Sequence, residues 1–148
     1  MDIKEQLSAT GSLTIVKTNN QGIVTEKVHV PNLVVTVGKT FIASRMAGTS
    51  SAVMSHMGVG AGTTSPVSGD TTLESALGAN VALTSTTPSS NTITYVATFG
   101  AGVSTGAITE AGIFNALSSG TMLCRTTFPV VNKEAGDTIT ITWVVTIS

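Results

Sequence analysis

Charged residues, aromatic residues and cysteine are all scarce in this sequence. Lys, Arg, Asp and Glu make up 10% of its 148 residues, Phe, Trp and Tyr make up 4%, and Cys124 is the single cysteine. One cysteine cannot form a disulfide within the chain or a cysteine zinc cluster. Because aromatic side chains are so few, a sugar-binding platform of stacked rings is disfavoured. We therefore expect stability to come from burial and assembly, and we expect no cofactor.

Excess positive charge and long apolar runs are also missing. The formal net charge is -1, which leaves nothing to neutralise a phosphate backbone, so nucleic acid is not an expected partner. No apolar run approaches the ~20 residues that span a bilayer, so no membrane is expected either. The first residues lack a basic region followed by an apolar one, and we expect synthesis in a cytoplasm without a signal peptide.

Apolar residues and threonine are abundant. Apolar residues make up 41% of the chain, and 26 residues are threonine. Threonine is β-branched and suits the polar face of a pleated strand better than a helix. A surface of Thr, Ser and Gly also costs little to desolvate, because few ions lose their water. The composition favours a β protein with wide contacts to neighbouring subunits.

The chain is expected to hold an N-terminal arm over 1–11 and one domain over 12–148. Apolar and polar residues alternate on both sides of a turn at 19–22, which predicts a hairpin ending at Pro31. Apolar spacings of three and four within 32–48 predict the one substantial helix. Asn32 or Thr36 is a candidate cap of this helix, Gly48 its stop, and Asp70 a candidate cap of a short helical turn over 71–77.

The second half carries strand signals throughout. A hairpin is expected around 88–91, and a second strand pair is expected over 107–115 and 121–128. Over 138–147 the alternation of apolar residues with Thr is nearly perfect. So amphipathic a strand needs a second layer over its Ile and Trp face. We predict a mainly β fold, an antiparallel β-sandwich or jelly roll with one short α-helix.

Three segments carry a resemblance to known proteins: 56–66, 108–115, and 121–128 leading to 140–143. In content, order and spacing they are similar to a group of small tailed-phage virion proteins. These proteins are of the capsid-decoration (cement), head-fibre or tail-fibre type. The similarity covers about Asn32 to the C-terminus.

The resemblance implies a β-sandwich or jelly-roll fold, a homotrimer and a place on the virion exterior after assembly in the host cytoplasm. The implied partners are other copies of the chain and the major capsid protein or other virion proteins. The first hypothesis is a decoration protein that binds and stabilises the assembled head shell. The alternative is a tail-fibre, head-fibre, neck or baseplate component involved in attachment. The resemblance does not separate capsid from tail.

No catalytic constellation stands out, and we expect no enzyme activity. The Gly-rich segment 58–64 has no Lys after its last Gly and no helix start, so a tight loop is favoured over a phosphate cradle. His29 and His56 have no Cys or carboxylate at a ligand spacing, so no metal site is assigned, although one His from each of three subunits meeting at a trimer axis stays open. A hydrolase acting on host polysaccharide is a third, disfavoured hypothesis.

Several residues have expected structural roles. Glu110 interrupts a strand of apolar and small residues, and Arg125 in the next strand is its natural partner in an ion pair on the sheet surface. Cys124 is expected to be a small buried hydrophobe and Trp143 a core anchor. If trimers form, the expected contact faces are the helix and the Gly-rich loop, through Val37, Phe41, Met46, Met57, Gly60 and Gly62.

Overall fold

The computed structural model describes residues 3–49 and 51–148, which form nine β-strands and one α-helix. In chain order these are β1 (Ala9–Thr18), β2 (Val24–Val34), α1 (Thr36–Met46), β3 (His56–Gly60), β4 (Val81–Ala82), β5 (Ser85–Ser89), β6 (Thr92–Phe99), β7 (Gly106–Phe114), β8 (Met122–Lys133) and β9 (Thr138–Ile147). The predicted mainly β fold with one short helix is confirmed.

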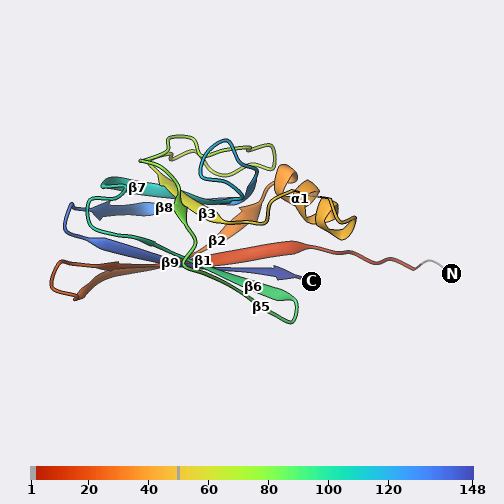
Figure 1. Cartoon of the computed structure of the whole chain (residues 1–148), viewed down its shortest axis with the longest axis horizontal. Coiled ribbons are helices and arrows are strands. Elements are labelled where there is room, and N and C mark those ends of the chain that lie inside the picture. The colour runs from red at the N-terminus through yellow and green to blue at the C-terminus, as the bar shows by residue number, and fades with distance from the viewer. Residues whose placement is uncertain (1–2, 50) are drawn as a thin grey trace.

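The described strands share one hydrogen-bonded order, β4-β3-β7-β8-β2-β1-β9-β6-β5, in which every neighbouring pair is antiparallel. The sheet curls, so that β3, β7 and β8 form one layer and β1, β9, β6 and β5 form the other (Figure 1). Strand β2 joins the layers, because it pairs with β1 along its length and with β8 through Leu33 and Val34. Since the strands form one continuous sheet, a sandwich or jelly roll is not confirmed at this finer level.

The core lies between the two layers, and β9 shows how the sequence builds it. The alternation predicted over 138–147 places Ile139, Ile141, Trp143 and Val145 inside, where each is at most 5% exposed. Trp143 lies opposite Leu13 of β1 and Tyr95 of β6 and is completely buried, as expected of a core anchor. The alternating Thr side chains therefore face outward.

The other layer contributes Cys124 to the same core. Its side chain is completely buried, and burial raises the pKa of the thiol well above its ordinary value. Tyr95 is buried from the opposite layer, and burial raises the pKa of its phenol to about 12. Both groups are therefore neutral at pH 7 and behave as core hydrophobes.

Helix α1 lies at one end of the curled sheet (Figure 1), against β8. Its N-cap is Val35, with no side-chain hydrogen bond, so neither Asn32 nor Thr36 caps it as predicted. Gly48 has a φ of +69°, and its amide donates to the Arg45 carbonyl, which agrees with the predicted stop. The helix approaches β8 closely at Gly38, where any Cβ would collide with the Leu123 carbonyl.

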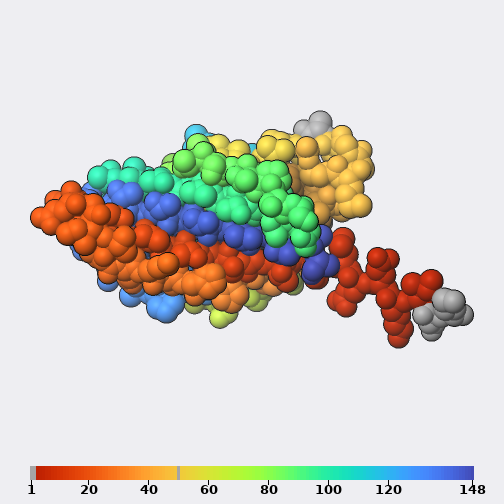
Figure 2. Space-filling view, turned by 90° about the horizontal axis from the view of Figure 1, so that it is seen from below, coloured from red at the N-terminus to blue at the C-terminus, as the bar shows by residue number. Residues whose placement is uncertain are grey.

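Three boundaries differ from the sequence predictions. The predicted arm over 1–11 is shorter, because β1 begins at Ala9 and Ser8 already exchanges two backbone hydrogen bonds with Ser148; residues 1 and 2 lie outside the described residues. The described part of the arm, 3–7, projects from the body (Figures 1 and 2). Residues 71–77 form no helix, and Pro88 lies within β5 instead of the turn.

Helix α1 has 11 residues, fewer than a membrane-crossing helix needs, and no other helix is present in the described parts of the chain.

Replacing the core anchor tests this packing. We expect Trp143→Ala to lower the free energy of unfolding by about 3–5 kcal/mol, because it removes a large buried side chain and leaves a cavity. Urea denaturation followed by circular dichroism measures the change. Val130→Ala, at a position 46% exposed, is the control and should change stability by less than about 1 kcal/mol. Equal effects of the two substitutions would contradict the assigned core.

Candidate functional site

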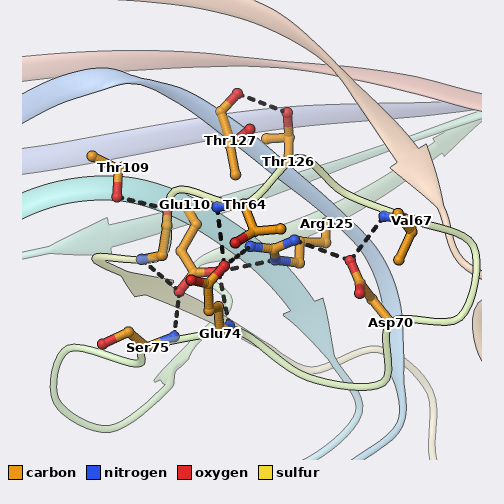
Figure 3. A network of polar contacts seen from close by, with 11 residues as sticks. Thr64, Val67, Asp70, Glu74, Ser75, Thr109, Glu110, Arg125, Thr126 and Thr127 are labelled. Atoms are coloured by element: carbon orange, nitrogen blue, oxygen red, sulfur yellow. Dashed lines mark hydrogen bonds and ion pairs between the residues drawn. The ribbon is translucent and has the colours of Figure 1, made fainter.

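The site with the densest polar contacts lies under the loop that joins β3 to β4. This β3–β4 loop, residues 61–80, runs over the outer side of β7 and β8, the side turned away from the other layer (Figure 1). Figure 3 shows the polar contacts beneath it. Leu73 anchors it in a small apolar cluster with Val35, Phe114 and Met122. Backbone hydrogen bonds from Ala61 to Ser75, and from Leu77 to Val59, close its base.

Glu110 of β7 holds the loop through its carboxylate. Its Oε1 accepts the amides of Gly62 at 3.0 Å and Ser75 at 2.7 Å, and its Oε2 accepts the amide of Glu74 at 3.0 Å. The fourth donor is Nε of Arg125, at 2.9 Å from Oε2. The Glu110 side chain is completely buried, and these four bonds replace the water that it loses on folding.

Arg125 of β8 completes a cluster of four charged side chains. Besides the Glu110 contact, its Nη1 donates to Asp70 at 3.0 Å, and its Nη2 lies 3.5 Å from the Glu74 carboxylate. The Arg125 side chain is 2% exposed, whereas Asp70 and Glu74 reach the surface. The cluster therefore joins two strands to two points of the β3–β4 loop.

The predicted partnership of Glu110 and Arg125 is present, but its predicted place on the sheet surface is wrong. In the β7–β8 register Glu110 lies opposite Thr127 and Arg125 opposite Gly112, so the two side chains meet diagonally. The loop covers both of them and turns the outer side of β7 and β8 into a second interior.

The two carboxylates of the loop also fix its own backbone. Glu74 accepts the Thr64 amide at 3.0 Å, and hydrogen bonding from the side chain and backbone of Thr64 holds the pKa of the Glu74 carboxyl below its ordinary value. Asp70 accepts the Val67 amide at 3.0 Å, so it closes a turn instead of capping a helix. Asp70 and Glu74 were not predicted, because their partner Arg125 is more than fifty residues away in the sequence.

Two glycines allow the carboxylate to come this close. A Cβ on Gly60 or Gly62 would lie 2.5 Å from Oε1 of Glu110. The Gly-rich segment therefore does bring a backbone amide to an anion, and that anion is a side chain of the same protein. Both glycines are buried, so their predicted role in a subunit contact is wrong.

The other predicted contact residues divide between core and surface. Met57 is completely buried in the core, so it is also wrong as a contact residue. Val37 and Phe41 are partly buried, and Met46 is 82% exposed beside the arm. The exposed part of the predicted contact face is thus the end of α1.

Each of the two histidines contacts one hydroxyl group and lies apart from the other. Nδ1 of His29 lies 2.9 Å from the Thr14 hydroxyl, and Nδ1 of His56 lies 2.8 Å from the Ser55 hydroxyl. Within residues 3–49 and 51–148, no three His, Cys, Asp or Glu side chains are placed to share a metal ion.

The geometry of Glu110 defines what this site does chemically. A carboxylate offers about four acceptor positions, and here four donors occupy them. Such a group cannot take a proton from a substrate without first losing one of these bonds. The arrangement positions a loop, and it has the chemistry of a structural clamp.

Comparison with known protein families, curated proteins and solved structures finds no match for this chain.

Removing the charge of Glu110 tests the clamp. Glu110→Gln places an NH₂ donor among amide donors and leaves Arg125 without its buried partner, so we expect a loss of about 3–5 kcal/mol in unfolding free energy. The matched control is Glu74→Gln, which removes a more exposed charge and should cost under about 1 kcal/mol. Urea denaturation measures both, and limited proteolysis should cut the β3–β4 loop only in the first variant. Similar stabilities would show that Glu110 does not hold the loop.

A pair of glycines in the same loop tests its close approach. Gly62→Ala should lower stability by about 1–3 kcal/mol, because the new methyl displaces the Glu110 carboxylate. Gly69→Ala has open space around its Cβ and should be neutral or stabilising by up to about 1 kcal/mol. Thermal unfolding of the two variants side by side gives the comparison, and a neutral Gly62→Ala would refute the approach.

Proposed function

We propose that this chain is a structural component of a phage virion, a decoration protein that binds the assembled head shell and stabilises it. The supporting observation is where the three segments with the resemblance lie. They contain β3 and the start of its loop, most of β7 and the first part of β8, which are neighbours in the order β3-β7-β8, and residues 140–143 of β9, which lies in the other layer. The Glu110 clamp binds β7, β8 and the loop after β3 together. Apart from 140–143, the segments with the resemblance therefore belong to one structural unit.

The physical properties of the body suit this role. A component that binds only the assembled shell favours that state by mass action, and it needs a rigid body and accessible contact residues. Here the clamp fixes the longest loop, while the described arm exposes Ile3 and Leu7 at 82% and 71%. Apolar side chains on a projecting segment are ready to bury against another protein.

We further propose that the partners are the major capsid protein and other copies of the chain, in the trimer that the resemblance implies. The accessible end of α1 around Met46 and the adjoining arm supply the contact residues. Leu7, Ile42 and Met46 line one groove of about 290 Å³ there, which gives the arm and the helix a common surface for a neighbour.

The location of the protein on particles tests the proposal. An antibody against the purified protein is used for gold labelling of intact virions in the electron microscope. Gold spread over the head is the expected result, since decoration proteins cover the shell. Gold confined to the tail or to one vertex would replace the proposal with the fibre, neck or baseplate hypothesis, and unlabelled virions would reject both. Antibody pre-absorbed with the purified protein is the control for background.

A further inference from the structure

One broad face of the molecule is left open. On β1, β9 and β6 every second side chain enters the core, and the residues between them point outward. The register aligns these outward residues in rows across the strands, for example Thr14, Thr142 and Val96 in one row and Ser12, Val144 and Thr94 in the next. Strands β2, β1, β9, β6 and β5 lie side by side on this face, and no other segment within residues 3–49 and 51–148 crosses them (Figure 2). We call it the outer threonine face.

The outer threonine face carries almost no charge. Its residues on β1, β9, β6 and β5 are Thr, Ser and Val, and among the described residues Lys27 and His29, both at the β2 margin, are its only basic side chains. Thr and Val present methyl groups at a regular spacing, and the Thr hydroxyl can both donate and accept a hydrogen bond. Covering such a face costs less than covering a charged one, because a hydroxyl that finds a partner in the contact replaces the hydrogen bond that it made with water.

The size of the face matches a stable protein contact. Strands lie about 4.8 Å apart and residues on one side of a strand repeat about every 6.7 Å, so five strands with about four outward residues each present about 650 Å². A standard interface buries about 600–1,000 Å² on each partner. The face is therefore large enough to hold a second protein without help from other surfaces.

The charge pattern of the outer threonine face indicates what kind of protein can cover it. A twofold contact brings each patch against the same patch of its partner, so a charged patch would repel itself, while an uncharged patch does not. A twofold axis that runs along β9, the middle strand of the five, places β2 against β5 of the partner copy. Lys27 then faces the Ser and Thr side chains of that strand instead of another Lys27.

We propose that two copies of this chain pack face to face through the outer threonine face, with Thr142 near the twofold axis. The contact does not depend on the virion role. Alone it gives a dimer, and combined with the trimer proposed above it gives six copies. In either assembly, loss of this contact halves the mass.

Size-exclusion chromatography with light scattering on the full chain tests the contact. The wild type should have twice the 15.0 kDa of one chain or another even multiple. Thr142→Lys should halve that mass, because two ammonium groups meet at the axis. Ser118→Lys adds the same charge in the exposed β7–β8 loop and should keep the wild-type mass.

A charge exchange identifies which surfaces meet. Thr142→Glu alone should also have half the wild-type mass, and an equimolar mixture of the Lys and Glu variants should recover the full mass. Circular dichroism shows whether each variant is folded, and the Glu variant carries the test if the Lys variant is not. A wild type of one or three chains, variants that keep the wild-type mass, or a mixture that stays at half mass would each overturn the proposal.

Discussion

The Glu110 carboxylate and the Arg125 guanidinium are buried together, and much of the structure depends on the hydrogen bonds that replace their hydration. A buried ion pair is stable only where hydrogen bonds meet its remaining donors and acceptors. Three of the four donors to Glu110 are loop amides from Gly62, Glu74 and Ser75. The pair therefore requires the β3–β4 loop, and the loop in turn depends on the pair, because three of its amides are bound by Glu110 in addition to its Leu73 cluster and the backbone bonds at its base.

This mutual dependence makes the two layers of the sheet unlike each other. Strands β7 and β8 are covered on both sides, by the core on one and by the loop on the other, and nearly every residue over 110–114 and 122–126 is buried. Strands β1, β9 and β6 are covered on the core side alone and keep an alternating pattern of buried and half-exposed residues. Within one chain, both sides of the layer with β7 and β8 are covered, whereas the layer with β1, β9 and β6 has one uncovered side.

The same difference explains which features the sequence could predict. In a strand covered on one side, polar and apolar residues alternate, so the bounds of β9 were predicted correctly from 138–147. A strand covered on both sides has no such period, so β7 and β8 were found only as strands, and Glu110 was assigned to the surface. Asp70 was interpreted as a helix cap because its local pattern fits one. Its contact with Arg125 depends on a loop path that no local spacing encodes.

The scarcity of charge acquires a physical explanation in this arrangement. The chain has seven basic and eight acidic residues, and four of them, Asp70, Glu74, Glu110 and Arg125, meet under one loop. In this cluster each carboxylate accepts hydrogen bonds from particular amides, and these bonds fix the path of the loop. The outer threonine face needs the opposite property, because a contact between identical surfaces tolerates neither unpaired charge nor a large desolvation cost. Concentrating charge inside one layer and keeping it off the outer face of the other, except at the β2 margin, serves both requirements with the same few ionised residues.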